Sequence, residues 1–204
     1  MYKHVIWDFD GTLFDTYPVM GRIFKEVLEE EGIVESLDEI VKHMKVSMTH
    51  ALQYYEKKYQ VDYVFIEKYH KQRNATETNL SRPFEGIEEI VKYIHTSNRK
   101  NYLYTHRGES AIQLLKMYGL FDYFSDFITS QQGFERKPSP EAITYLIDKH
   151  RIIHTEVIMI GDRDLDILAA KNAGINACFF ADRDEKNSNS DFTITNIQQL
   201  YSIV

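Results

Sequence analysis

The chain has 204 residues, of which 43% are hydrophobic and 27% charged, a composition typical of a globular protein with a buried core. The length fits one large domain, or one core with a modest insertion. Its 24 Lys and Arg against 31 Asp and Glu give a net charge of −7, which argues against a dedicated surface for nucleic acid or anionic membranes.

The first predicted element is a strand at residues 5–7, a short apolar run that leads into a turn at residues 8–12. The following segment, from about residue 17 to residue 82, has apolar residues at helical spacing and charged residues on the other faces. Four amphipathic helices are predicted there, near residues 19–28, 37–44, 48–59 and 64–69. No convincing strand pattern interrupts them, so we expect a small helical module.

From Pro83 onward, strand and helix patterns alternate. The expected strands are residues 102–105, 127–129, 157–160 and 177–180. The expected helices are residues 86–96, 110–118, 140–149 and 164–173, with a short one near 197–201. Alternation of this kind predicts an α/β fold with a Rossmann-like parallel sheet and helices on both faces. Residues 1–15 and 83–204 would form a discontinuous α/β core, with residues 16–82 as a helical module inserted after the first strand.

Polar residues follow the expected strands at their carboxyl ends, where parallel sheets bind ligands. They are Asp8, Asp10, Thr105, Asp162, Asp164 and Asp166. Lys137 lies in a turn-rich stretch just before a helix. If these strands are neighbours, four or five carboxylates meet one lysine and one threonine in one crevice. Carboxylates at close range must take up protons or bind a cation. Oxygen ligands alone point to Mg²⁺, or to Mn²⁺ as a substitute, and Mg²⁺ in turn suggests a phosphate substrate.

The combination and order of these residues resemble the haloacid-dehalogenase-like superfamily, and within it the phosphoglycolate-phosphatase-like branch with a small helical cap. Each piece alone is an ordinary turn or strand residue; their joint order carries the resemblance. The matching motifs are residues 8–13 (Asp-Phe-Asp-Gly-Thr-Leu), Thr105, Lys137 within residues 137–140, and residues 161–166 (Gly-Asp-Arg-Asp-Leu-Asp).

The resemblance implies a role for each catalytic residue. Asp8 would attack phosphorus and form an aspartyl-phosphate, and Asp10 would protonate the leaving oxygen and then activate water. Thr105 and Lys137 would hold phosphoryl oxygens. The same substrate-binding set includes Thr12, together with backbone N–H groups that follow Asp8 and Thr105.

The resemblance also implies the ligands of Mg²⁺: the Asp8 carboxylate, the backbone carbonyl of Asp10 and the Asp162 carboxylate. Asp166 would be a further ligand, or a group that orients Lys137 or a bound water. Asp164 could lie near the metal, but we favour its being an acidic residue at a helix N-terminus.

The function that the resemblance implies is a Mg²⁺-dependent phosphomonoesterase acting on a small phosphorylated metabolite. Dehalogenases of the superfamily lack the second aspartate of the first motif, so Asp10 sets that activity aside. A sugar phosphomutase is the enzymatic alternative, although related mutases carry a histidine where this chain has Met20. A non-catalytic binding module ranks lowest, because no nucleophile or metal ligand is lost.

Two departures from the branch concern the substrate. Asn-Lys often follows the motif threonine in this branch, whereas this chain has His106 and Arg107, which we include among the substrate-binding candidates. The stretch at residues 42–50 falls where relatives place a specificity loop, but it lacks their glycine. One hypothesis is that Lys45, His50 or Arg107 contacts the non-reacting end of the substrate. Solvent-facing polar side chains are an equal alternative for each.

Cellular location and partners follow from weaker signals. The first residues have no basic region, long apolar stretch or cleavage site, so no signal peptide is expected. No apolar run approaches the roughly 20 residues of a membrane span. The single cysteine, Cys178, lies in an apolar run and is expected to be a buried packing thiol in a reducing compartment. We therefore expect a cytoplasmic monomer or homodimer with no nucleic-acid or membrane partner.

Overall fold

The computed structural model describes residues 2–181 and 186–204, and the chain divides into two compact units. The α/β unit comprises Met1–Phe14 and Pro83–Val204, and the helical unit comprises Asp15–Arg82. Two very short strands, β2 (Phe14–Asp15) and β3 (Arg82–Pro83), pair with each other where the chain passes from one unit to the other.

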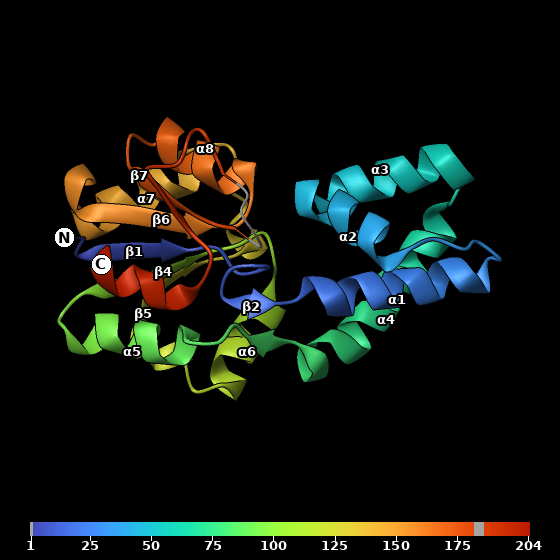
Figure 1. The fold of residues 1–204 in the computed structure, drawn as a ribbon, viewed down its shortest axis with the longest axis horizontal. Coiled ribbons are helices and arrows are strands. Elements are labelled where there is room, and N and C mark those ends of the chain that lie inside the picture. Colours follow the sequence, from blue (N-terminus) through green and yellow to red (C-terminus); the bar gives the residue numbers. More distant parts are fainter. Residues whose placement is uncertain (1, 182–185) are drawn as a thin grey trace. The chain divides into compact units, whose positions relative to one another are not determined.

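A six-stranded parallel sheet forms the centre of the α/β unit, in the order β5-β4-β1-β6-β7-β8 (Figure 1). Its strands are β1 (His4–Trp7), β4 (Lys100–Tyr104), β5 (Phe124–Ile128), β6 (Val157–Gly161), β7 (Asn176–Phe180) and β8 (Phe192–Ile194). The predicted fold class is confirmed. After β1 the chain first builds β4 and β5 on one side and then β6 to β8 on the other. The carboxyl end of β1 is therefore a topological switch point, where such sheets bind ligands.

Helices cover both faces of this sheet, and alternate residues of β1 contribute to two separate cores (Figure 1). Val5 and Trp7 pack with α5 and α6 on one face, whereas Ile6 packs with α7 and α8 on the other. The helices are α5 (Ile87–Thr96), α6 (Glu109–Met117), α7 (Glu141–His150) and α8 (Asp164–Asn172), with short 3₁₀ turns at Phe121–Tyr123, Ser130–Gln132, His154–Glu156 and Ile197–Ser202. The sequences of the buried strands are continuous apolar runs because both faces of these strands are covered.

The two edge strands depart from the sequence-based expectation. β5 begins at Phe124, three residues before the predicted start, and it includes the polar Asp126. An edge strand tolerates that residue because the Asp126 carboxylate is paired with Lys149 and His150, each at 2.7 Å. The three-residue β8 was not predicted at all, since so short an edge strand carries little hydrophobic pattern.

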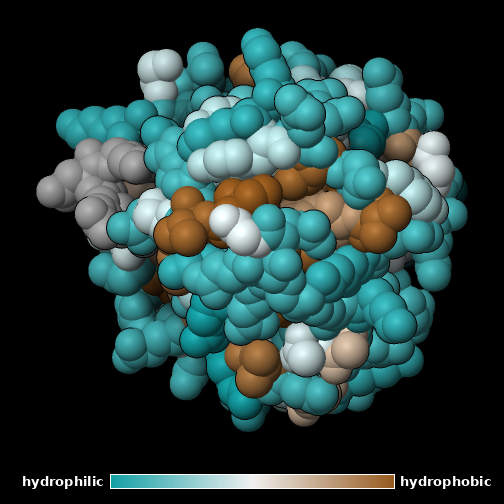
Figure 2. Space-filling view, turned by 90° about the vertical axis from the view of Figure 1, so that its right-hand side faces the viewer, coloured by the Kyte–Doolittle hydropathy of each residue, from teal (hydrophilic) through white to brown (hydrophobic). Residues whose placement is uncertain are grey.

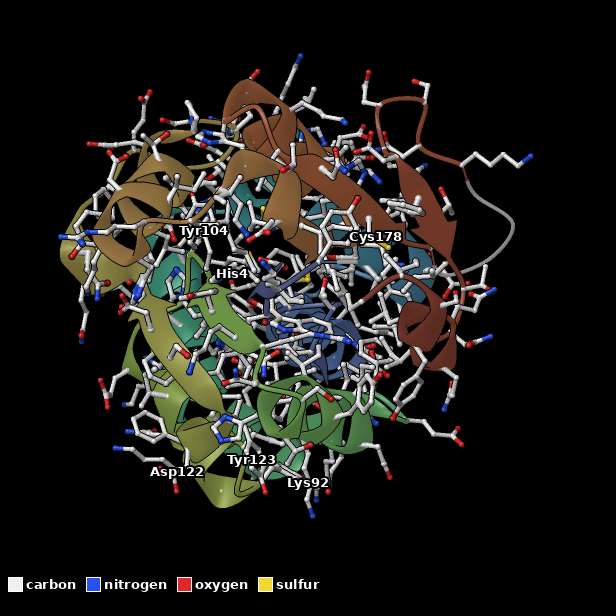
Figure 3. All side chains as sticks on the ribbon, turned by 90° about the vertical axis from the view of Figure 1, so that its left-hand side faces the viewer. His4, Lys92, Tyr104, Asp122, Tyr123 and Cys178 are labelled. Carbon is white, nitrogen blue, oxygen red and sulfur yellow. The ribbon has the colours of Figure 1, made fainter. Side chains whose placement is uncertain are left out.

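Cys178 lies on β7 and is fully buried, as Figure 3 shows among the labelled side chains of the α/β unit. Burial raises the pKa of its thiol to about 12, so the thiolate is strongly disfavoured at neutral pH. The predicted packing role is confirmed.

The helical unit contains four helices, as predicted: α1 (Tyr17–Glu30), α2 (Leu37–Val46), α3 (Met48–Tyr59) and α4 (Tyr63–Leu80). Its core centres on Phe24, whose ring lies 5.0–5.1 Å from the rings of Tyr55, Phe65 and Tyr69. α4 continues eleven residues beyond Tyr69, where the sequence turns polar and an amphipathic pattern gives no signal.

Side-chain caps fix the starts of three of these helices. Ser36 and Ser47 accept hydrogen bonds from the N–H groups of Glu39 and His50, and Asp62 accepts two at the start of α4.

The space-filling view shows a band of hydrophobic surface crossing a mostly hydrophilic face (Figure 2). Among residues 2–181 and 186–204, no helix is both long and apolar enough to cross a membrane.

Candidate active site

The turn after β1 places two carboxylates at the switch point of the sheet. Asp8 is only 1% exposed, and its backbone N–H donates to the carbonyl of Ile160 on β6 at 2.9 Å. Between the two aspartates, Phe9 is buried in the core and stacks on Phe14, with ring centroids 4.7 Å apart. Gly11 has a φ of +79°, a conformation that glycine adopts without strain and that lets the chain turn back.

Lys137 is buried between these elements and holds the Asp8 carboxylate. Its ammonium donates to Asp8 Oδ1 at 2.5 Å and to the backbone carbonyl of Tyr104 at 2.9 Å, and it pairs with Asp166 Oδ1 at 2.7 Å. The ring of Tyr104, labelled in Figure 3, has its centroid 4.4 Å from the Lys137 Nζ. A lysine has three N–H donors, and these three oxygens occupy them all. Lys137 therefore fixes the nucleophile candidate and neutralises part of its charge.

The second carboxylate oxygen of Asp8, Oδ2, is buried and, unlike Oδ1, has no hydrogen-bond partner among the residues that the structure describes. Burial raises the pKa of Asp8 above its ordinary value, and the nearby Asp166 charge adds to this effect, although Lys137 opposes it. A buried carboxylate oxygen with no partner is costly unless a ligand or a cation meets it.

Two further carboxylates lie beside Asp8: Asp162 on the loop between β6 and α8, and Asp166 in the first turn of α8. Asp8, Asp162 and Asp166 each offer one oxygen, and these oxygens all lie within 4.8 Å of one another. Thr12, which is fully buried, donates from its hydroxyl to Asp162 Oδ1 at 3.4 Å. An all-oxygen set beside Asp8 Oδ2 is the donor chemistry that a hard divalent cation prefers, so the residues present fit such an ion.

Asp166 has a second set of partners that distinguishes it from Asp162. Its Oδ2 accepts the backbone N–H of Arg163 at 3.1 Å, which caps α8, while its Oδ1 meets Lys137. Burial alone would raise the pKa of Asp166, but Lys137 and Arg163 outweigh it and the pKa is lowered. Of the two roles left open for Asp166, these contacts support the one in which it orients Lys137.

The start of α8 also explains why Gly161 precedes these aspartates. A Cβ on Gly161 would lie 2.3 Å from the Cβ of Asp166, far closer than two carbon atoms can approach. Asp164 is the first residue of α8, and its Oδ1 accepts a hydrogen bond from Asn187 at 2.5 Å. It is an acidic residue in the first turn of a helix, as we favoured.

Arg107 is one of the substrate candidates, and it is neither exposed nor solvent-facing. Its side chain is 4% exposed, and Nη1 pairs with Asp10 Oδ1 at 2.7 Å. The guanidinium also lies over the ring of Phe9, 5.2 Å from its centroid, and donates to Ser110 Oγ from two nitrogens. Arg107 thus fixes the side chain of the acid/base candidate. Its contact with a substrate stays a prediction.

His106 and Thr105 organise the loop after β4. The Oγ1 of Thr105 accepts the N–H of Arg107 at 3.1 Å, while His106 Nε2 accepts the N–H of Lys137 at 3.0 Å. Burial lowers the pKa of His106 to about 3, and the positive charges of Lys137 and Arg136 add to the effect. His106 is therefore a neutral imidazole that holds the Lys137 backbone.

The remaining two candidates belong to the helical unit and have partners within it. Lys45 Nζ lies 5.8 Å from the centroid of the Tyr17 ring. His50 Nε2 lies 3.1 Å from His43 Nδ1, and the other ring nitrogen of His43 lies 3.1 Å from Glu39 Oε1. Their contact with a substrate stays a prediction.

Two contributors to the site were not assigned from the sequence. Tyr104 supplies a backbone carbonyl to Lys137, and a backbone acceptor leaves no mark in residue type. Arg163 lies between Asp162 and Asp164 in the chain, and its guanidinium reaches the same carboxylates. The position of a positive residue between two aspartates was the sequence signal that could have identified Arg163 as part of the site.

The family model for haloacid dehalogenase-like hydrolases matches residues 5–180, and the chain belongs to this family. Among curated relatives, a phosphoglycolate phosphatase of Vibrio vulnificus is 28% identical over 187 residues, covering 84% of this chain and 80% of the relative. The pyrophosphatase PpaX of Halalkalibacterium halodurans is 27% identical over 218 residues, covering 98% and 95%. The family recognised from the motifs is confirmed.

Solved structures agree with this assignment. A hydrolase from Streptococcus pneumoniae is 31% identical with a TM-score of 0.70, covering 99% of this chain and 97% of that one. A haloacid-dehalogenase-superfamily hydrolase from Geobacter sulfurreducens has a TM-score of 0.79 at 19% identity and covers both chains fully, which shows the shared fold.

Proposed function

We propose that the protein is a Mg²⁺-dependent phosphomonoesterase that removes phosphate from a small metabolite through an aspartyl-phosphate on Asp8. One observation carries this proposal: the Asp8 carboxylate is buried at the switch point and held by Lys137 through one oxygen, while its other oxygen has no partner within residues 2–181 and 186–204. A nucleophile must be fixed in place and still have a lone pair directed at its target.

The reaction has two steps. Asp8 attacks phosphorus, the bond between phosphorus and the ester oxygen breaks, and Asp10 gives a proton to the leaving alcohol. Asp10 then takes a proton from water, the water oxygen attacks phosphorus, and the bond to Asp8 breaks to release inorganic phosphate. Lys137 holds the nucleophile throughout, and Arg107 holds the Asp10 side chain that moves the proton.

Asp8, Asp162 and the backbone carbonyl of Asp10 would hold the metal ion. Bound Mg²⁺ would supply positive charge that offsets the carboxylates and the phosphoryl oxygens. In this proposal Asp166 orients Lys137, and its two contacts, with the Lys137 ammonium and the Arg163 backbone N–H, support that role.

The relatives suggest which substrates to test first. Phosphoglycolate and pyrophosphate follow from the names of the two curated relatives. A sugar phosphomutase remains the alternative, since a candidate β-phosphoglucomutase from Thermotoga maritima has a TM-score of 0.82 at 21% identity. Met20, rather than a histidine, speaks against that activity.

A substrate screen with matched variants tests the proposal. Phosphorylated metabolites, including 2-phosphoglycolate, pyrophosphate and glucose 1-phosphate, are ranked by kcat/KM at fixed Mg²⁺. Asp8→Asn should lower kcat by at least about a thousandfold, as loss of a nucleophile does. Asp122→Asn, which changes an exposed aspartate labelled in Figure 3, should leave the rate unchanged. Turnover that survives Asp8→Asn would falsify the mechanism, and isomerisation without phosphate release would identify a mutase.

The substrate's non-reacting end is the part that Lys45, His50 or Arg107 would contact. Alanine at Lys45 and at His50 should raise KM for the best substrate while leaving kcat nearly constant, because such contacts bind ground and transition states alike. Unchanged KM in both variants and in Arg107→Ala would remove all three from the substrate site.

We also propose a cytoplasmic location, which fits the unpaired, buried Cys178 and which cell fractionation tests.

A further inference from the structure

One guanidinium lies against all three carboxylates of the candidate metal site. The Nη2 of Arg163 is 3.6 Å from Asp8 Oδ1, while its Nε is 4.0 Å from Asp162 Oδ1 and 3.4 Å from Asp166 Oδ2. Its side chain is 13% exposed, compared with 0% for the side chain of Lys137. The proposed mechanism assigns Arg163 no part.

The charges of the cluster explain why a cation is needed at this position. Asp8, Asp162 and Asp166 can carry three negative charges, and Lys137 offsets one of them. Arg163 offsets a second, whereas a divalent ion in its place would offset both that remain. Like charges a few ångströms apart repel strongly in a buried setting, so the cluster without a metal ion depends on Arg163.

The two cations of the site are held in different ways. Lys137 makes contacts of 2.5–2.9 Å with its three oxygens, in the range of charge-assisted hydrogen bonds. The contacts of the Arg163 guanidinium with these three carboxylates are 3.4–4.0 Å, longer than such bonds, so the carboxylates hold it less closely than they hold Lys137. The Arg163 backbone is fixed separately, because its N–H donates to Asp166 Oδ2 at the start of α8.

We propose that Arg163 is the resident counter-ion of this carboxylate cluster and that a divalent cation binding there displaces its guanidinium. Arg163 and the metal ion then compete for the same oxygens. Arg163 stabilises the metal-free protein and weakens metal affinity, while its fixed backbone keeps Asp166 in place in both states. The inference rests on the proposed function in taking these carboxylates as the metal site.

Calorimetric titration with MgCl₂ tests the proposal on protein freed of metal and without substrate. Arg163→Met removes the charge but keeps the side-chain length and the backbone N–H. It should bind Mg²⁺ at least about fivefold more tightly, because a competing positive charge about 4 Å away is lost. In EDTA its Tm should fall by about 2–4 °C, since about 1 kcal/mol shifts the Tm of a chain of this size by that amount. Arg163→Lys, which retains the charge, should lie close to the wild-type protein in both measurements.

A control separates this effect from a change of net charge. Arg22→Met removes one positive charge from an exposed position within α1 and keeps a similar helix propensity, so both its Mg²⁺ affinity and its Tm in EDTA should equal the wild-type values. Unchanged or weaker Mg²⁺ binding by Arg163→Met, or an unchanged Tm in EDTA, overturns the proposal.

A measurement on the wild-type protein covers the case in which Arg163→Met does not fold. The ¹H–¹⁵N signal of the Arg163 Nε–H, assigned by its absence in Arg163→Lys, should shift on saturation with Mg²⁺ and exchange faster with solvent. A signal that stays unchanged refutes displacement. Mg²⁺ binding with displaced Arg163 but no phosphate release would contradict the proposed function alone, whereas Asp8-dependent hydrolysis with Arg163 undisturbed would contradict this inference alone.

Discussion

The α/β unit and the helical unit bury different chemistry. At the sheet's carboxyl end, Asp8, Lys137 and Asp166 are all at most 4% exposed and are packed against one another. The helical unit instead centres on aromatic rings around Phe24. Glu77 is buried there too, paired with Arg73 at 2.6 Å, whereas Lys58 and Glu35, 2.7 Å apart, lie nearer the surface. Charges kept away from water persist only with close partners, so the first region tolerates little change. The second is held by apolar packing, which tolerates substitution of similar volume.

The sharpest test of this comparison removes one lysine from each unit. Lys137→Met leaves Asp8 and Asp166 without their shared partner and should cost about 3–5 kcal/mol of unfolding free energy in EDTA, the range for breaking a buried pair. Lys58→Met should cost far less, because the Lys58 side chain is 38% exposed and water screens the pair. Urea denaturation measures both values.

Added Mg²⁺ extends that experiment. A divalent ion supplies positive charge to the same carboxylates, so it should recover part of the stability lost in Lys137→Met and none of that lost in Lys58→Met. Equal costs for the two lysines in EDTA would show that burial of charge does not distinguish the two units.

Two glycines test the same contrast through packing. Gly161→Ala would set a Cβ 2.3 Å from the Cβ of Asp166, close to that residue's backbone, and should cost about 1–3 kcal/mol and most of the activity. Gly21→Ala in α1 would meet Leu37 Cδ1 and Val41 Cγ2 at 2.8 Å. The leucine methyl lies at the end of a flexible side chain, whereas valine is restricted at χ1. Higher helix propensity of alanine, worth about 1 kcal/mol, should offset part of that crowding, so Gly21→Ala should cost less than Gly161→Ala. Thermal melts and hydrolysis assays measure both; a Gly161→Ala protein with wild-type activity would contradict the reasoning.

The contrast between the units also explains what the sequence could predict. Asp8, Thr105 and Asp162 directly follow strands, so topology alone brings them to one edge of the sheet. Lys137 lies in a turn-rich stretch before α7 and was added to them by the motif. The hydrogen bonds that Lys137 makes within the protein were not predictable, because one of its acceptors is the backbone carbonyl of Tyr104. Periodicity predicted the four helices of the helical unit, although only the first part of α4.

Arg107 shows the limit of motif reasoning. Its departure from the family pattern was visible, and it suggested either a substrate contact or a solvated side chain. Its pairing with Asp10 depends on how the loop after β4 lies beside the turn after β1, which is a tertiary relation between segments almost a hundred residues apart. Residue type at one position cannot encode such a relation.

The smallest predicted effect concerns two histidines. The pKa of His106 in the folded protein is lowered to about 3 by burial and by neighbouring cations, compared with about 6.5 in the unfolded chain. The unfolded state therefore binds one more proton between these values, and stability is lost as pH falls below about 6.5. Between pH 7.5 and pH 5, and allowing for partial exposure, His106 should cost the wild-type protein about 1–2 kcal/mol.

His106→Gln should abolish that pH-dependent loss, since Gln keeps an acceptor for the Lys137 N–H but does not titrate. The counterpart in the helical unit is His70, whose pKa is also lowered by burial but with only Arg73 as an added cause. His70→Gln should therefore change the slope of stability with pH less than His106→Gln does. Urea denaturation of the three proteins at pH 7.5, 6 and 5 measures the slopes. A wild-type slope that persists in His106→Gln would mean that His106 is not the buried neutral imidazole that fixes the Lys137 backbone.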